Sequence, residues 1–285
     1  MSETLGAGLR RAAETLGAAG VDDAKLEARR LLEHASGLDR AQLIAEDQAP
    51  LGPEAAAALD AAVARRATHE PLAHILGAAP FHEIMIRTDA RALVPRSDSE
   101  GVVELALELL PPGPVEIADL GTGTGCLLLA LLAARPDARG IGLDASSDAA
   151  DLARENAAAL GLSDRCTLLA KSWSDWTDDG RIDLVISNPP YIPSADIAGL
   201  APDVRDYDPR AALDGGGDGL DAYREITALC ADQLRPGAWL VLEIGWDQAA
   251  AVGALLTAQG FADLRLRQDL EGRDRALAAR RPPAR

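Results

Sequence analysis

The stretch VEIADLGTGTGCLLLALL, residues 115–132, decides the fold class of this chain. Its first six residues have the composition of a buried strand, and its last seven have that of a buried helix. The loop between them consists of Gly121, Thr122, Gly123, Thr124 and Gly125. Glycine permits positive φ and close backbone approach, and a helix N-terminus presents free N–H groups. The stretch therefore predicts a strand, a glycine loop and a helix that cradle a cofactor, with an ordinary structural turn as the alternative.

The spacing of these glycines narrows the class of cofactor. It is G-x-G-x-G, whereas dinucleotide loops follow G-x-G-x-x-G and phosphate loops end in Gly-Lys followed by Ser or Thr. A ligand with a pyrophosphate is therefore disfavoured. The next predicted strand, residues 140–143, ends at Asp144, about twenty residues beyond the loop, where an acid receives both ribose hydroxyls of a nucleoside. The alternative role of Asp144 is to cap the following Ala-rich helix, which the nearby serines are also able to do.

Trp173 marks the end of another predicted strand. It follows the apolar residues 166–170, so its ring is placed to lie against an adenine. Because tryptophan buries a large area wherever it sits, packing in the core is an equally good interpretation of this residue alone.

The strand over residues 183–187 ends in an unusual tip, formed by Asn188, Pro189, Pro190 and Tyr191. Proline has no N–H and restricts the residue before it to extended conformations, so this tip presents mainly hydrogen-bond acceptors. The Asn188 side-chain oxygen and the Pro189 carbonyl are suited to accept from a planar NH2 group, and Tyr191 offers a face for stacking. The alternative is a proline-terminated strand before an ordinary loop.

Strands alternate with helices from residue 99 onward, which predicts a mostly parallel sheet with ligands at the carboxyl ends of its strands. Asp119, Asp144, Trp173 and Asn188 all fall at or near such ends. We therefore expect one site. The last clear strands are 239–244 and 264–267, and the Ala-rich residues 275–279 suit either a strand or a helix.

These motifs resemble those of the HemK/PrmC family of S-adenosylmethionine-dependent N5-glutamine methyltransferases, which modify the Gly-Gly-Gln glutamine of peptide-chain release factors. The resemblance covers nearly the whole chain. Residues 119–125, which begin with Asp119, resemble the first cofactor motif of that family, and residues 188–191 resemble its substrate-amide motif. Asp144 corresponds to its ribose acid and Trp173 to its adenine-side residue. The resemblance implies an α/β fold, with a Rossmann-like class I methyltransferase sheet and a small all-helical N-terminal domain.

The resemblance also implies a division of the chain. Residues 65–77 resemble the segment that joins the helical N-domain of the family to its catalytic domain. We expect a helical bundle over residues 1–76, a hairpin-like connector over 77–95 and the methyltransferase domain over 96–285. The bundle carries no catalytic constellation, so it is expected to dock the substrate; a purely structural bundle is the alternative. Residues 193–219 lack periodicity and are expected to form a lid, or else a solvated linker.

The chain departs from the family pattern at a few positions. The family motif Pro-Arg-Pro-x-Thr-Glu begins here at Pro95, with Ser97 and Ser99 in place of the second proline and the threonine. Glu83 stands where the family commonly has glycine. Ser172 stands where an acid often precedes the tryptophan, so the contact to the adenine amino group is left unassigned.

Composition favours a cytoplasmic enzyme. The chain has 285 residues, 48% of them hydrophobic, and neither a membrane-spanning stretch nor a signal-peptide pattern. Its 3 cysteines form no C-x-x-C pair and its 4 histidines lack metal-ligand spacing, so no metal is expected. A net charge of −17 argues against direct binding of nucleic acid as the main function.

The resemblance therefore implies an enzyme that transfers a methyl group from S-adenosylmethionine to the N5 amide of a release-factor glutamine, and the composition agrees with it. The catalytic residues would be Asn188, Pro189, Pro190 and Tyr191. Asp119, the loop 121–125, Asp144, Trp173 and Asn188 would bind the cofactor. The alternatives are a ribosomal-protein glutamine methyltransferase, an adenine-N6 nucleic-acid methyltransferase and a cofactor-binding scaffold without catalysis. The charge disfavours adenine, and the intact tip disfavours a scaffold.

Overall fold

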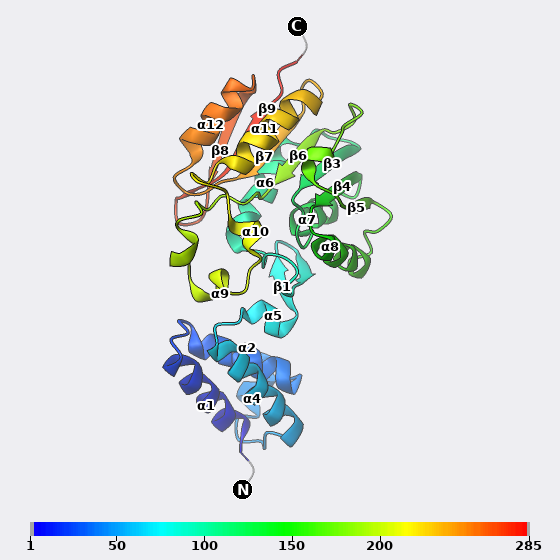
Figure 1. Cartoon of the computed structure of the whole chain (residues 1–285). Coiled ribbons are helices and arrows are strands. Elements are labelled where there is room, and N and C mark those ends of the chain that lie inside the picture. Colours follow the sequence, from blue (N-terminus) through cyan, green and yellow to red (C-terminus); the bar gives the residue numbers. More distant parts are fainter. Residues whose placement is uncertain (1–2, 284–285) are drawn as a thin grey trace. The chain divides into compact units, whose positions relative to one another are not determined.

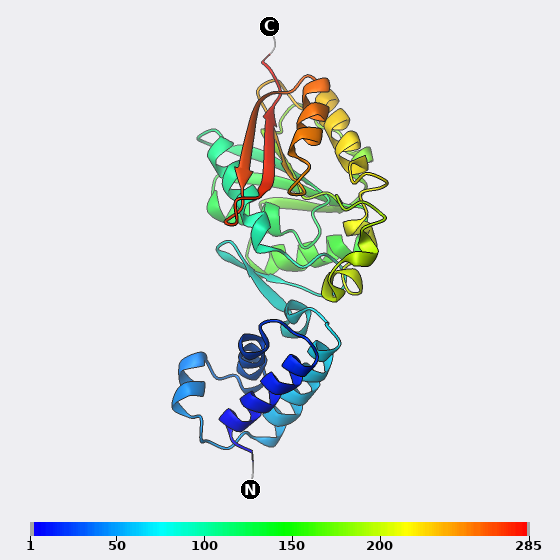
Figure 2. The ribbon, with the colours of Figure 1, turned by 90° about the vertical axis from the view of Figure 1, so that its left-hand side faces the viewer.

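The computed structural model describes residues 3–283, which divide into two compact units. A helical unit comprises the described residues up to Gly77 together with Ala201–Tyr207. A sheet unit comprises Ala78–Leu200 and the described residues from Asp208 onward. In Figures 1 and 2 the N-terminal helices are blue to cyan, and the strands of the main sheet run from green to red.

The helical unit forms because apolar residues recur at helical spacing and polar residues cap the helix starts. Thr4 accepts a hydrogen bond from the Ala7 N–H, and Asp39 forms a capping box with Gln42. Leucines such as the fully buried Leu16 make the core. The helices of this unit are α1 (Leu5–Ala18), α2 (Ala24–Ser36), α3 (Arg40–Ala45), α4 (Pro53–Ala67), α5 (Leu72–Leu76) and the short α9 (Pro202–Arg205).

A hairpin opens the sheet unit. β1 (Ala78–Phe81) pairs antiparallel with β2 (Ile84–Arg87), and His82 in the turn has a φ of 50°. Phe81 and Ile86 are fully buried in the core that lies against the main sheet. The hairpin is therefore packed onto this unit by its apolar side chains.

The main sheet has seven strands within residues 3–283, in the order β5-β4-β3-β6-β7-β9-β8. The parallel strands are β3 (Val115–Leu120), β4 (Ala138–Asp144), β5 (Cys166–Ala170), β6 (Leu184–Ser187) and β7 (Trp239–Glu243). β9 (Asp274–Arg280) runs antiparallel between β7 and β8 (Ala262–Gln268). This is the expected mostly parallel α/β sheet, and its parallel register brings the ends of β3, β4 and β6 to one edge.

The Ala-rich stretch that suited either a strand or a helix is the strand β9. Ala276, Leu277, Ala278 and Ala279 are buried because helices pack on β9 from both faces. Small side chains suit this position, since they let a helix approach the strand closely.

Helices cover both faces of the sheet, and alternate strand residues point to opposite sides. Ile117 belongs to the core under one group of helices, whereas its neighbour Ala118 belongs to the core on the other face. The first group contains α6 (Glu100–Leu109), α7 (Cys126–Ala134) and α8 (Ser147–Ala159). The second contains α11 (Asp221–Gln233) and α12 (Ala249–Ala258).

The expected lid segment, residues 193–219, contains short helical turns. They are η3 (Ile197–Gly199), α9 in the helical unit and α10 (Arg210–Leu213). Two more short turns, η1 (Ser97–Ser99) and η2 (Trp173–Asp175), flank the sheet. Across residues 3–283, none of the helices is both long enough and apolar enough to cross a membrane.

Candidate active site

A cavity of about 320 Å³ lies at the carboxyl edge of the sheet, entirely within the sheet unit. It is lined by residues from four strand ends, by the loop 91–96 and by part of the segment 209–212. The expected site residues that line it are Gly121, Thr122, Gly123, Thr124, Asp144, Trp173, Asn188 and Pro190. Gly125, Pro189 and Tyr191 are next to lining residues in the sequence without lining the cavity themselves, and Asp119 lies two residues before Gly121.

The three glycines of the glycine loop adopt left-handed backbone conformations. Gly121, Gly123 and Gly125 have φ values of 76°, 55° and 83°. A Cβ at Gly121 would stand 3.3 Å from the Trp173 ring, and one at Gly125 would stand 3.0 Å from Leu129. A side chain at Gly121 would therefore occupy the space between the loop and the Trp173 ring. Glycine is needed at position 125 because Leu129 of α7 packs directly against it.

Asp119 fixes the glycine loop through a hydrogen bond with Thr122. It is fully buried at the end of β3 and accepts a hydrogen bond from the Thr122 hydroxyl at 2.7 Å. Burial raises the pKa of Asp119 to about 7, the Thr122 hydrogen bond opposes this, and the nearby Asp144 charge adds to it. Asp119 thus fixes the conformation of the loop that faces the cavity.

Asp144 ends β4 and faces the cavity with a fixed carboxylate. Its two oxygens accept from the Gly123 and Ser146 N–H groups, each at 2.9 Å. The cap of α8 is Ser146, whose hydroxyl accepts from the Ala149 N–H at 3.2 Å. Each Asp144 oxygen keeps a further lone pair for a hydroxyl in the cavity.

Trp173 lies between the cavity and the core under α11 and α12. Its ring lies over Gly121, and its Nε1 donates to Glu225 on α11 at 3.0 Å. The ring packs partly against the core under α11 and also lines the cavity. Packing in the core therefore describes part of its environment, and the contact of its ring with adenine stays a prediction.

The Asn-Pro-Pro-Tyr tip follows β6 directly. Ser187 donates to the Leu120 carbonyl and ties the ends of β6 and β3 together at 2.5 Å. Beyond it, Asn188 and Pro190 line the cavity, while the Tyr191 hydroxyl points away to the buried Glu243 at 3.4 Å. Burial and the adjacent Glu243 charge raise the pKa of Tyr191, so its hydroxyl stays protonated at neutral pH.

Two family models match the chain, one described as "PrmC N-terminal domain" over residues 8–77 and one as "Methyltransferase small domain" over residues 102–200. A release factor glutamine methyltransferase of Cereibacter sphaeroides is 46% identical over 97% of this chain and 98% of its own length. The Caulobacter vibrioides protein of the same name is 41% identical over 99% and 98%. The chain belongs to the release factor glutamine methyltransferase family. It is therefore a methyltransferase, and its cofactor is S-adenosylmethionine.

Solved structures agree with this family at the level of the fold. The hMettl16 catalytic domain, solved in complex with a 3′UTR hairpin, superposes with a TM-score of 0.57 at 18% identity, covering 77% of this chain and 81% of that one. A methyltransferase from Pyrococcus furiosus superposes with a TM-score of 0.50 at 15% identity, covering 69% and 88%.

Sequence reasoning missed an asparagine that holds the cofactor loop of this methyltransferase. Asn156 on α8 is buried; its Nδ2 donates to the Thr124 carbonyl at 2.9 Å and the Arg87 carbonyl at 3.1 Å. Its Oδ1 accepts from the Arg87 N–H at 2.8 Å. The signal was a single amide on the apolar face of an Ala-rich helix. Asn156 thereby joins the glycine loop to β2.

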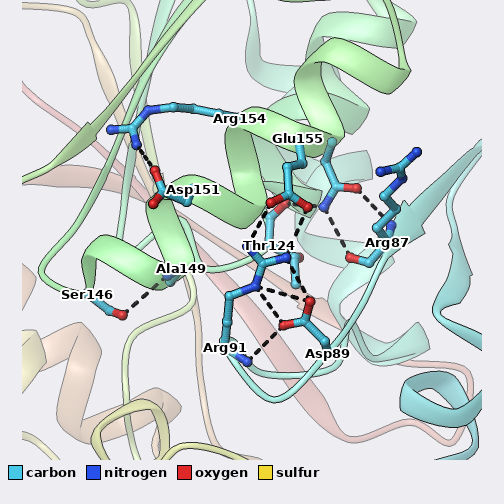
Figure 3. Close-up of polar contacts among 10 residues, drawn as sticks. Arg87, Asp89, Arg91, Thr124, Ser146, Ala149, Asp151, Arg154 and Glu155 are labelled. Carbon is cyan, nitrogen blue, oxygen red and sulfur yellow. Dashed lines mark hydrogen bonds and ion pairs between the residues drawn. The ribbon is translucent and has the colours of Figure 1, made fainter.

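A charged group holds the loop 91–96 beside Asn156. Figure 3 shows Arg91 between Asp89 and Glu155, with which it makes ion pairs at 2.7 and 2.8 Å. Because Arg91 begins the part of the chain that lines the cavity, these contacts fix one end of that wall to α8. Glu155 lies 64 residues from Arg91 in the sequence, so local patterns do not reveal this pair.

Glu243, at the end of β7, is another residue that sequence reasoning missed. It is buried behind Tyr191, and burial raises its pKa to about 7 against the effects of the Ser99 hydroxyl and the Arg275 charge. Ser99, which departs from the family motif, is itself buried at the start of α6. Its hydroxyl is therefore placed in this polar group behind the tip.

Proposed function

We propose that this methyltransferase transfers a methyl group from S-adenosylmethionine to the side-chain amide nitrogen (N5) of the glutamine in the Gly-Gly-Gln motif of peptide-chain release factors. The observation that carries the proposal is that Asn188 and Pro190 line the same cavity as the glycine loop and Asp144. Relatives at 46% and 41% identity, named for release factor glutamine methylation, support the choice of substrate.

The chain's own residues fit the cofactor. The cradle at Gly121 and Gly123 accepts a ligand where side chains would block it, the Asp144 oxygens accept from ribose hydroxyls, and Trp173 offers its ring to adenine. When bound, the cofactor supplies an electrophilic methyl group on a sulfonium. Asp119 acts through Thr122 to hold the loop in the binding conformation.

The tip would position a poor nucleophile. The Asn188 side-chain oxygen and the Pro189 carbonyl accept the two N–H bonds of the glutamine amide, which aims its nitrogen at the methyl group. The same two oxygens stabilise the positive charge that develops on the amide. No base needs to act first, because the amide loses a proton to water after the new N–C bond has formed.

Release factors are favoured over the other candidate substrates. The match to the PrmC N-terminal domain over residues 8–77 supports a helical unit that docks the body of a release factor, whereas the acidic net charge of −17 disfavours adenine in nucleic acid. A release factor acts on the ribosome, so the proposal also places the enzyme in the cytoplasm.

Mass spectrometry tests the proposal. A purified release factor is incubated with the enzyme and methyl-labelled S-adenosylmethionine, and the label is mapped by fragmentation. We expect one methyl group on the Gly-Gly-Gln glutamine and none on a factor with that glutamine changed to alanine. Labelling of ribosomal proteins or of adenine in parallel reactions, with the release factor unmodified, would reject the proposal.

A further inference from the structure

A second segment of the chain is hydrogen-bonded to the residues that directly follow the Asn-Pro-Pro-Tyr tip. Ile192 donates its N–H to the Leu213 carbonyl at 3.0 Å, and Gly215 donates to the Ile192 carbonyl at 2.9 Å. Ser194 donates to the Gly216 carbonyl at 2.9 Å. The segment 213–216 therefore runs alongside residues 192–194, immediately after the tip.

Two glycines make this approach possible. A Cβ at Gly215 would stand 2.8 Å from the Tyr191 Cα, and one at Gly219 would stand 2.4 Å from the Tyr191 carbonyl oxygen. Gly219 also has a φ of 74°. By contrast, a Cβ at Gly217 would meet nothing within 4 Å. The contacts with the tip thus require glycine at 215 and 219 and leave 217 unconstrained.

Gln248 closes this arrangement with its side-chain amide. Its Nε2 donates to the Tyr191 carbonyl at 2.9 Å and to the Gly219 carbonyl at 3.3 Å. Its Oε1 accepts from the Gly245 N–H at 2.9 Å and lies 3.3 Å from the Tyr223 hydroxyl. Both ends of the amide are therefore engaged, with the donor end on the tip and the acceptor end on the turn after β7.

The chemistry of the tip explains why such a residue is needed. Pro189 and Pro190 have no N–H to donate, so this stretch has few hydrogen bonds of its own to fix it. A glutamine is suited to hold it, since it donates to carbonyls and accepts from an N–H at once. A glutamate of the same size would set a carboxylate oxygen against the Tyr191 and Gly219 carbonyls.

We infer that Gln248 is a positioning residue for methyl transfer. Through its hydrogen bond to the Tyr191 carbonyl, Gln248 sets the position of the Asn188 acceptor. Gly219 has the same positioning role, because its backbone lies against the Tyr191 carbonyl. Gln248 does not line the cavity, so its effect is indirect. The inference rests on the proposed function only for the choice of substrate.

Two substitutions test the donor role. Gln248→Glu keeps the size and the acceptor, and Gln248→Met removes both hydrogen-bonding ends. The matched control is Gln233→Met, which removes a comparable bond, from the Asp178 N–H to Gln233 at 3.1 Å, on another part of the unit. We expect both Gln248 variants to lose kcat on a release factor by about tenfold to 10²-fold, as for a small misplacement of reacting groups. S-adenosylmethionine affinity should change less than about threefold by calorimetry, and the control should keep wild-type kcat.

A second pair of variants tests the same Tyr191 carbonyl from the backbone at Gly219. Gly219→Ala presses on the Tyr191 carbonyl and should give the same loss of kcat with retained cofactor affinity, while Gly217→Ala should behave as wild type. If the Gln248 variants do not fold, this pair tests whether the contact at the Tyr191 carbonyl controls kcat. Wild-type kcat in folded Gln248→Met and Gly219→Ala would overturn the inference.

The inference and the proposed function fail in different ways. A wild-type enzyme that leaves release factors unmodified rejects the function, and crystal structures then test the positioning role without activity. We expect the backbone at Asn188 in Gln248→Met to shift by about 1 Å, the scale on which misplacement impairs catalysis. An unmoved tip would reject the inference whatever the substrate.

Discussion

Arg96 donates a hydrogen bond to the fully buried carboxylate of Asp208 at 2.7 Å. The same carboxylate accepts from the Val94 N–H at 3.4 Å. Val94 and Arg96 belong to the loop that lines one side of the cavity, and Pro209, next to Asp208, lines it from the following segment. One carboxylate thus joins two walls of the cavity that lie far apart in the sequence.

Arg96→Met should therefore weaken the attachment of the loop 91–96 to the segment that begins at Asp208. We expect a loss of unfolding free energy of about 1–3 kcal/mol, the usual cost of removing a charged partner from a buried group, together with weaker cofactor binding. Urea unfolding and calorimetry measure the two effects. Arg210→Met breaks the exposed pair with Asp214 and should change neither quantity measurably. Equal results for the two variants would contradict the role of the Asp208 contact.

Asp144→Ala should weaken the binding of S-adenosylmethionine. The carboxylate is held by two backbone N–H groups with lone pairs left for ribose hydroxyls, so its loss should cost about 1.5–3 kcal/mol, the range for hydrogen bonds to a charged group. Calorimetry gives the value directly. Asp148→Ala, an exposed acid on α8, is the control and should bind normally. We also expect no binding of NAD, and tight NAD binding without S-adenosylmethionine binding would overturn the cofactor assignment.

Asn188→Ala should separate chemistry from cofactor binding. It removes one of the two acceptors for the glutamine amide while leaving the glycine loop intact, so turnover should fall by about 10²-fold or more. Cofactor affinity should stay near the wild-type value. Single-turnover assays on a release factor measure the chemical step. Wild-type turnover in this variant would mean that the tip does not hold the amide.

Glu243 should make the stability of the enzyme depend on pH. Because burial raises its folded pKa to about 7 from an ordinary 4.5, its stabilising contribution is complete below about pH 4.5 and is lost as the pH rises through 7. Glu243→Gln should remove a change on the order of 3 kcal/mol in unfolding free energy across this window. Urea unfolding at pH 5 and pH 8 measures it, with the exposed Glu83→Gln as control. Identical pH dependence in wild type and Glu243→Gln would show that Glu243 titrates normally.

Removal of the helical unit should act on substrate recognition. A truncated enzyme that begins at Ala78 keeps every residue that lines the cavity, so it should bind S-adenosylmethionine if it folds. On an intact release factor it should show a raised KM, since remote contacts bind ground and transition states alike. On a short Gly-Gly-Gln peptide, both forms should have similar kcat/KM. Equal kcat/KM on the intact factor would leave the helical unit a structural role only.

Local patterns predict the parts of this molecule that local chemistry determines. The strand, glycine loop and helix of residues 115–132 follow from composition, and the acceptor-rich tip at Asn188 follows from its prolines. β9 was ambiguous because alanines carry no strong periodicity, and only its position between β7 and β8 settles it. Asn156, Glu243 and Gln248 escaped prediction for another reason. Their partners lie on distant elements, so their roles exist only once the sheet has formed.

The position of β9 also has a consequence for the order of assembly during synthesis. β9 follows β8 in the chain but lies between β8 and β7, so β7 has an open edge until β9 has been made. The Ile244 N–H, just beyond β7, finds its partner in the Arg275 carbonyl of β9. An unpaired strand edge invites wrong pairing with other chains. The nascent enzyme is therefore most exposed to aggregation in the interval between the synthesis of β7 and that of β9.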